Sequence, residues 1–324
     1  MKILPVIALI TLTLLFCSCN TEKEKGAGNA AMVPVSAGSG PVSFIDDDGR
    51  TIVVDKPAKR IISLYSAHTE NIFWLGAGAS VIGGHKTCTW PPEAAPLAVY
   101  DYTGDPEYVI AGEPDLVLTA PRISRAHADY LSALEKAGIR VVSLYTDVFD
   151  DFDEYIRRLA LLCGVDASGR LAEFHGRLEA IRAKTAAIPE SARKRAFFEA
   201  AENHLRTVVP GSFPALAIEF AGAVNAVVNA EPVYKGSSMA SFGLERVMEI
   251  AGNIDVYIAQ SGAMNRTVSV ESIKARPGYG AIKAVNDGRV YIIDERLISS
   301  PTSRFLDGIE KLAGFIYPEP QWEP

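Results

Sequence analysis

The chain has 324 residues, of which 39 are Asp or Glu and 32 are Lys or Arg, so its formal charge at pH 7 is −7. This acidic balance argues against nucleic-acid binding, whose affinity comes from neutralising phosphates with Lys and Arg. It suits a protein that docks on a basic partner. The length is large for a single hydrophobic core and comfortable for two lobes.

The N-terminus predicts a secretory signal over residues 1–18. Lys2 precedes an apolar stretch that ends at Phe16, and this stretch is too short to span a bilayer permanently. The sequence around Cys19 resembles a bacterial lipobox, because the small Ser18 precedes it. The resemblance implies cleavage before Cys19 and acylation of its thiol. It also implies an extracytoplasmic protein anchored to the cell membrane, in a periplasm or on the outer surface. Plain secretion with Cys19 unmodified is the alternative.

Residues 19–41 predict a lipidated, flexible tether between this anchor and a folded body. They are rich in Gly, Ala, Ser and Asn and have no apolar periodicity. Such a segment cannot bury enough surface to fold, and its composition is typical of a linker.

Residues 42–166 predict an N-terminal α/β lobe. Two β-rich runs surround Asp48 and Gly49, which is typical of a hairpin. Strands and helices then alternate, and this alternation predicts a parallel sheet. The predicted strands cover residues 61–64, 81–83, 115–119 and 140–144, and the predicted helices cover 69–75 and 126–137.

Residues 151–188 form a helical pattern with a break at 164–166. We interpret the second part, residues 167–189, as one long helix that bridges two lobes. Pro189 ends it, because proline cannot continue a helix. An ordinary surface helix is the alternative interpretation.

Residues 190–324 repeat the alternation and predict a C-terminal α/β lobe. Strands are expected at 196–199, 255–259 and 290–293, and helices at 214–221, 243–251 and 305–316. The predicted fold class is therefore α/β, with two Rossmann-like lobes that each hold a central sheet, bridged by one long α-helix. Ligands of such folds bind beyond the carboxyl ends of the strands, often between domains.

The predicted body contains two cysteines, Cys88 and Cys163. Cys163 follows an apolar helical run over residues 159–162, which favours a buried free thiol. A disulfide between the two is the alternative, since an extracytoplasmic compartment is oxidising.

An ordered set of segments resembles the solute-binding proteins of iron-siderophore, haem and cobalamin ABC importers. These segments cover residues 44–50, 59–84, 90–94, 105–118, 279–294 and 299–313. The resemblance implies two lobes bridged by one helix, a ligand held in the cleft between them, and little hinge closure. It also implies a monomer that delivers its ligand to a permease with a cytoplasmic ATPase and performs no catalysis.

Two acidic residues at predicted helix starts are candidates for docking on the permease. Glu107 follows Asp105, which can cap the helix, and Pro106, which suits its first position. Glu245 begins the corresponding helix of the second lobe. The resemblance implies that each acid pairs with Arg on the permease, a directional interaction. Glu245 is two residues further from Asp255 than Glu107 is from Asp115. The alternative is that both acids only stabilise their helix starts.

The resemblance also implies ligand contacts from loops that follow strands. The candidates are Tyr65, His68, Trp90, Tyr100, Tyr102 and Arg122 in the first lobe, and His204, Arg206, Phe213, Tyr234, Lys235 and Arg304 in the second. Aromatic rings offer flat apolar area, and Arg pairs with carboxylates or catecholate oxygens.

The ligand class stays open between a ferric siderophore, a corrinoid and haem. Haem would require an axial ligand for its iron, and Tyr100 is a candidate for that role. We expect no cofactor of the protein's own, so iron or cobalt would belong to the ligand. The five His show no close ligand spacing, which argues against a bare divalent metal.

Other functions are weighed against this one. The sequence has no Gly-rich phosphate loop after a strand and no Gly-x-Ser-x-Gly motif, which argues against an enzyme. A binding protein for a free metal ion or an oxyanion, and a surface scaffold lipoprotein without a permease, are the remaining alternatives.

Overall fold

The structure is a computed structural model that describes residues 41–202, 205–234 and 237–318. The predicted signal peptide, Cys19, nearly all of the tether, His204 and Lys235 lie outside these residues. No helix within the described part of the chain is long and apolar enough to cross a membrane.

The N-terminal lobe holds a five-stranded parallel sheet in the order β5-β4-β3-β6-β7. An antiparallel hairpin precedes it, as predicted. The strands are β1 Val42–Ile45, β2 Thr51–Val54, β3 Ile61–Ser63, β4 Val81–Gly84, β5 Ala98–Val99, β6 Leu116–Thr119 and β7 Arg140–Ser143. The α-helices are α1 Ser66–Trp74, α2 Glu107–Ala111, α3 Pro121–Ala126, α4 Ala128–Lys136 and α5 Phe152–Cys163.

The C-terminal lobe holds a four-stranded parallel sheet in the order β10-β8-β12-β13, with a separate antiparallel pair, β9 and β11. Its strands are β8 Arg195–Glu199, β9 Arg206–Val208, β10 Val224–Asn225, β11 Met239–Ser241, β12 Val256–Ser261 and β13 Val290–Asp294. Its helices are α7 Phe213–Phe220, α8 Gly243–Glu249, α9 Val270–Lys274, α10 Lys283–Asn286, α11 Glu295–Ile298 and α12 Phe305–Ile316. Short 3₁₀ turns lie at Gly78–Ser80, Pro92–Ala94, Phe149–Asp151, Glu190–Ala192, Ala251–Asn253 and Tyr279–Ala281.

The two parallel sheets are wound in the same way. The first strand of each, β3 or β8, lies inside the sheet, and the chain builds outward on one side before it crosses to the other. The direction of winding therefore changes between β3 and β6 and between β8 and β12. Ligands of open α/β sheets bind beyond the carboxyl ends of the strands at such switch points.

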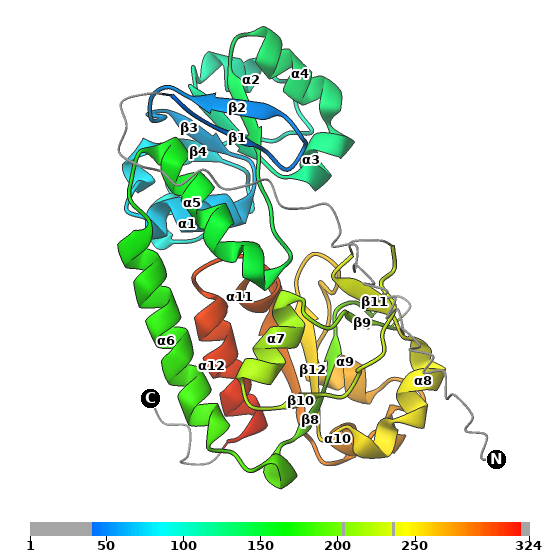
Figure 1. Cartoon of the computed structure of the whole chain (residues 1–324). Coiled ribbons are helices and arrows are strands. Elements are labelled where there is room, and N and C mark those ends of the chain that lie inside the picture. Colours follow the sequence, from blue (N-terminus) through cyan, green and yellow to red (C-terminus); the bar gives the residue numbers. More distant parts are fainter. Residues whose placement is uncertain (1–40, 203–204, 235–236, 319–324) are drawn as a thin grey trace, which may run out of the picture. The chain divides into compact units, whose positions relative to one another are not determined.

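The long helix that the sequence predicts is α6, Ser168–Ala186, with 19 residues. It leads from α5 of the N-terminal lobe along α7 and α12 of the C-terminal lobe (Figure 1). Leu171, Phe174, Leu178 and Ile181 are buried at helical spacing and form its packed face. The exact domain boundaries at 166–167 and 189–190 stay predictions.

One hydrophobic cluster contains residues of both sheets, among them Leu118 of β6 and Phe198 of β8. Phe149, between β7 and α5, is partly buried and packs against this cluster. Its ring centroid lies 5.5–6.4 Å from those of four phenylalanines, which come from α6, α7 and α12: Phe174, Phe213, Phe220 and Phe305. Both body cysteines are buried and free, which agrees with the favoured interpretation.

Some predicted boundaries differ from the observed ones. The first helix begins at Ser66, three residues before its predicted start. The expected helix over 126–137 is α4, and α3 before it is a separate helix that was not predicted; His127 between them leaves the helical conformation (φ −133°, ψ 41°). The short elements β5, β9 to β11 and α9 to α11 were not predicted, since runs of two to five residues carry little periodicity.

Candidate functional site

Two tyrosines follow strands of the N-terminal sheet with the same local sequence. Ser63 is the last residue of β3 and is followed by Leu64 and Tyr65. Ser143 is the last residue of β7 and is followed by Leu144 and Tyr145. The rings of Tyr65 and Tyr145 meet edge to face, with centroids 6.0 Å apart. Tyr145 was missing from the sequence-based candidates, although the repeated Ser-Leu-Tyr after a buried β-branched run could have revealed it.

Charged and phenolic groups of both lobes affect the pKa values of these two tyrosines. Burial raises the pKa of Tyr145 to about 12, and the phenol of Tyr234 acts in the same direction. Burial also raises the pKa of Tyr65, and the carboxylate of Glu295 adds to that effect. The positive charge of Arg122 lowers the pKa of both tyrosines and so opposes part of these shifts. We name Tyr65, Arg122, Tyr145, Tyr234 and Glu295 the tyrosine cluster.

The charge of Arg122 is available to a ligand. Arg122 is exposed on α3 and makes no hydrogen bond or ion pair with any other residue that the structure describes. Tyr234 is 67% exposed. The tyrosine cluster therefore combines three tyrosine rings with one guanidinium that has no partner in the described part of the chain, and it includes three of the predicted site residues.

His68 is a correction to the predicted site. Its side chain is fully buried in α1, with Nδ1 2.8 Å from the Tyr155 hydroxyl and Nε2 2.9 Å from the Thr119 carbonyl oxygen. Desolvation lowers the pKa of His68 from 6.5 to about 4, so the ring is neutral at pH 7. Both ring nitrogens are occupied, and His68 is a structural residue rather than a ligand contact.

Trp90 and Arg304 belong to a contact between the lobes, which we name the interlobe clamp together with Glu70. Arg304 donates from Nε and Nη2 to the Glu70 carboxylate at 2.8 and 2.6 Å. Its guanidinium also stacks 4.7 Å from the centroid of the Trp90 ring. Arg296 adds a hydrogen bond of 2.9 Å to the Thr89 hydroxyl. The charge of Arg304 is therefore already paired, and this corrects its predicted role as an anion-binding residue.

Tyr100 is placed for packing rather than for axial ligation. A methyl group at Gly83 would lie 2.2 Å from its ring, and one at Gly112 would lie 2.6 Å from its hydroxyl oxygen. Tyr102 stacks on His85 with centroids 4.6 Å apart and lies 4.8 Å from His127. Both tyrosines pack against the hydrophobic cluster on the α4 side of the sheet.

Two candidates of the C-terminal lobe have no clear ligand-facing position. Arg206 is half-buried at the start of β9, and its Nε is buried without a hydrogen-bond partner among the described residues. Phe213 is only 2% exposed and packs against Phe149, Phe152 and Phe305, so it is a core residue.

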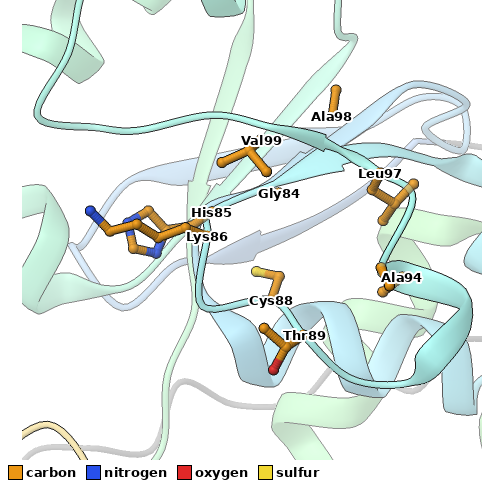
Figure 2. Close-up of a pocket in the computed structure, with 10 residues that line it drawn as sticks. Gly84, His85, Lys86, Cys88, Thr89, Ala94, Leu97, Ala98 and Val99 are labelled. Atoms are coloured by element: carbon orange, nitrogen blue, oxygen red, sulfur yellow. The ribbon is translucent and has the colours of Figure 1, made fainter.

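A pocket of about 160 Å³ lies beside β4 and β5 (Figure 2). Cys88 and Thr89 line it, and His85 and Lys86 extend to the opposite side from Ala94 and Leu97. Burial raises the pKa of the Cys88 thiol, so it stays protonated at pH 7. Ligand pockets usually measure roughly 300–1,000 Å³, so this pocket is too small for a metal chelate.

The C-terminal lobe carries a buried polar network that the sequence did not reveal. Glu199, at the carboxyl end of β8, is 0% exposed. It accepts hydrogen bonds from Arg276 at 2.5 and 3.2 Å, from Asn265 at 3.3 Å, and from the Tyr257 hydroxyl. Asn265 in turn accepts from the Glu202 amide at 2.7 Å, so the network fixes the loops that follow β8 and β12.

The two predicted docking acids are exposed at the starts of their helices. Glu107 is the first residue of α2, and its amide donates to Asp105 Oδ1 at 3.0 Å, as predicted for a cap. Glu245 is the third residue of α8. Neither carboxylate makes an ion pair with another described residue. The two extra residues before Asp255 lie in the 3₁₀ turn Ala251–Asn253, after the helix.

No group of three or more His, Cys, Asp or Glu residues within the described ranges could hold a metal ion.

Two parallel α/β lobes joined by one long helix, with aromatic side chains after their strands, define a two-lobed solute-binding protein. The chain belongs to the periplasmic binding protein family, whose model matches residues 61–297. The similar proteins are solute-binding proteins rather than enzymes.

Individual relatives agree with this assignment. The chain is 26% identical over 286 residues to YvrC of Bacillus subtilis, an uncharacterized ABC transporter substrate-binding lipoprotein. The matched region covers 86% of this chain and 86% of the relative. It is 24% identical over 264 residues to the vitamin B12-binding protein of Vibrio cholerae, covering 80% of this chain and 90% of the relative. A periplasmic binding protein from Veillonella parvula has a similar solved structure, with a TM-score of 0.70 at 21% identity over 87% of this chain and 99% of that chain.

Proposed function

We propose that the chain is the extracytoplasmic solute-binding component of an ABC importer and that its ligand is a corrinoid. The tyrosine cluster is the observation that carries this proposal. It contains two tyrosine rings of the N-terminal lobe and one of the C-terminal lobe, and aromatic rings suit a bulky and largely uncharged macrocycle. The Vibrio cholerae relative, named a vitamin B12-binding protein, supports the same ligand class.

The charges argue for a corrinoid over the other chelates. A ferric siderophore with anionic donors would need several free arginines, whereas Arg304 is paired with Glu70 and Arg296 with Asp294. Haem would need an axial residue, and Tyr100, its candidate, is packed against glycine backbone. The protein needs no cofactor of its own, since the cobalt belongs to the ligand.

Delivery of the ligand to the permease would depend on α2 and α8, the helices that carry Glu107 and Glu245. Glu107 and Glu245 each present an unpaired carboxylate that can take a bidentate guanidinium of the permease. Two such pairs, one on each lobe, would fix the orientation of the monomer on a permease with a cytoplasmic ATPase. Acylation of Cys19 would hold the protein at the membrane. If it does, Cys19→Ser should release the protein from the membrane fraction.

Ligand titration of the purified full-length chain tests the proposal. Cyanocobalamin, haemin, a ferric catecholate siderophore, nickel chloride and molybdate are each added and followed by calorimetry and absorbance. We expect saturable one-to-one binding of cyanocobalamin alone. Tight binding of haemin or the siderophore without cyanocobalamin would refute the corrinoid, and binding of nickel or molybdate alone would favour the free-ion alternative.

A further inference from the structure

The helices α2 and α8, which carry the docking acids Glu107 and Glu245, occupy equivalent positions in their lobes. We call them the two docking helices. Asp115 follows α2, and its amide donates to the Arg60 carbonyl at 3.0 Å; Asp255 follows α8, and its amide donates to the Arg195 carbonyl at 2.9 Å. The two carboxylates also accept from the backbone amides of Arg60 and Arg195, at 3.0 and 2.9 Å. The same hydrogen bonds therefore connect each helix to the first strand of its sheet.

The position of each acid relative to the buried face of its helix is also the same. Each carries one fully buried valine two residues after its acid, Val109 after Glu107 and Val247 after Glu245. A buried valine at that spacing places both acids on the outer side of the helix. Glu107 and Glu245 are thus equivalent by geometry as well as by sequence, in spite of the longer turn before Asp255.

Each acid has an exposed large hydrophobic neighbour. Tyr108 is 76% exposed, the highest value among the large hydrophobic side chains that the structure describes. Leu244 is 45% exposed. Arg246 is held back, because it donates to the Asn229 carbonyl at 2.9 Å and its guanidinium lies 4.3 Å from the centroid of the Phe242 ring. Leu244 and Glu245 are therefore left as the outward pair on α8.

We propose that the permease covers Tyr108 and Leu244 when the protein docks, and that each helix presents a pair of one carboxylate and one apolar side chain. The partner surface that fits such a pair is a basic side chain set beside an apolar recess, because it complements both the charge and the exposed apolar area. The pairs differ, an aromatic ring on one lobe and an aliphatic side chain on the other, so the two recesses must differ as well. This inference rests on the proposed function.

Cross-linking in cells tests the contact without any ligand. The full-length chain is produced in its source organism with the photoreactive residue p-benzoylphenylalanine in place of Tyr108 or, as a control, of Val99. Val99 is 67% exposed on the edge strand β5. We expect an adduct with the integral-membrane subunit of an ABC importer from position 108 and none from position 99. Adding Glu107→Lys should remove the adduct.

Uptake of labelled cyanocobalamin then measures the strength of the contact. We expect Tyr108→Ser and Leu244→Ser to lower the initial uptake rate about thirtyfold, the size typical of an interface hot spot. Tyr108→Phe, Leu244→Met and Val99→Ser should stay within twofold at equal protein levels. The phenylalanine variant separates the apolar ring from its hydroxyl group.

The outcomes distinguish this inference from the proposed function. If Glu107→Lys abolishes uptake while Tyr108→Ser leaves it unchanged and position 108 gives no permease adduct, the inference is overturned and the proposed function stands. If the purified chain does not bind cyanocobalamin, the proposed ligand is overturned, and the cross-link alone decides the inference.

Discussion

The segments that follow β3 and β6 are joined by neutral hydrogen bonds in the N-terminal lobe, and those that follow β8 and β12 are joined by a buried ion pair in the C-terminal lobe. In the first lobe, the neutral ring of His68 joins the Tyr155 hydroxyl to the Thr119 carbonyl. In the second, the Glu199 carboxylate holds Arg276 and Asn265. Two sheets with the same winding therefore fix equivalent loops by different chemistry.

The difference has consequences for stability. A neutral buried histidine destabilises the folded state when it is protonated, so its contribution to the free energy of unfolding depends on pH. A buried ion pair responds most to the loss of one partner, because the remaining charge is left desolvated. The interlobe clamp pairs the buried Glu70 with the partly exposed Arg304. We therefore expect its loss to cost less free energy of unfolding than the loss of the ion pair in the C-terminal lobe.

The largest expected effect breaks the ion pair of the C-terminal lobe. Arg276→Met leaves the Glu199 carboxylate buried without its cation, and we expect the free energy of unfolding to fall by about 3–5 kcal/mol. Urea denaturation measures this change. Arg125→Met, which alters an exposed residue of α3, is the control and should cost less than about 0.5 kcal/mol. A loss below about 1 kcal/mol for Arg276→Met would show that Glu199 does not depend on this partner.

The next effect tests the neutral network of the N-terminal lobe. The folded-state pKa of His68 is about 4 and the ordinary pKa of histidine is 6.5, so the unfolded chain binds the proton more readily. Stability is therefore fully present above pH 6.5 and is lost as the pH falls toward 4. The expected contribution of His68 is about 3 kcal/mol. Urea denaturation from pH 7 to pH 4.5 should show a steeper loss for the wild type than for His68→Gln. Parallel curves would contradict the assignment.

A smaller effect is expected at the interlobe clamp. Arg304→Gln removes the bidentate pair with Glu70 and the stacking on Trp90, and we expect a loss of about 2 kcal/mol in thermal or urea unfolding. The matched control is Arg177→Gln, which removes an exposed pair with Asp307 and Glu310 and should cost less than about 1 kcal/mol. Equal losses for the two variants would mean that burial of Glu70 adds nothing.

The smallest effect concerns the ligand and leaves both networks intact. Tyr145→Ala should weaken cyanocobalamin binding about tenfold, since one stacking ring is lost from the tyrosine cluster. Tyr145→Phe keeps the ring and should bind within twofold of the wild type in the same calorimetric titration. An unchanged affinity for Tyr145→Ala would place the ligand away from the tyrosine cluster.

The sequence predicts the fold well where local signals are strong. Buried β-branched runs located β3, β6, β7, β12 and β13, and helical periodicity located α5, α6 and α12. The caps and spacing around Glu107 also led to its exposed position. These features depend on residues close together in the chain, so one sequence is enough to find them.

The candidate site was harder to predict, because its partners are distant in the sequence. Four consecutive polar residues of α1, His68 to Asn71, are all buried, although their polarity favours an exposed face. They are stabilised by distant partners, such as Arg304 for Glu70, which is 234 residues away. No local pattern reveals such a pairing, and so Arg304 was predicted to contact the ligand.

The phenylalanines around Phe149 have a consequence for how this architecture can be recombined. Phe149 precedes α5, while its ring neighbours come from α6, α7 and α12. A cut anywhere along α6 would expose these rings on both fragments, and neither fragment could bury them alone. Exchanging one lobe with that of a relative should therefore yield a soluble chimera only if the phenylalanines at the junction are transferred as a set.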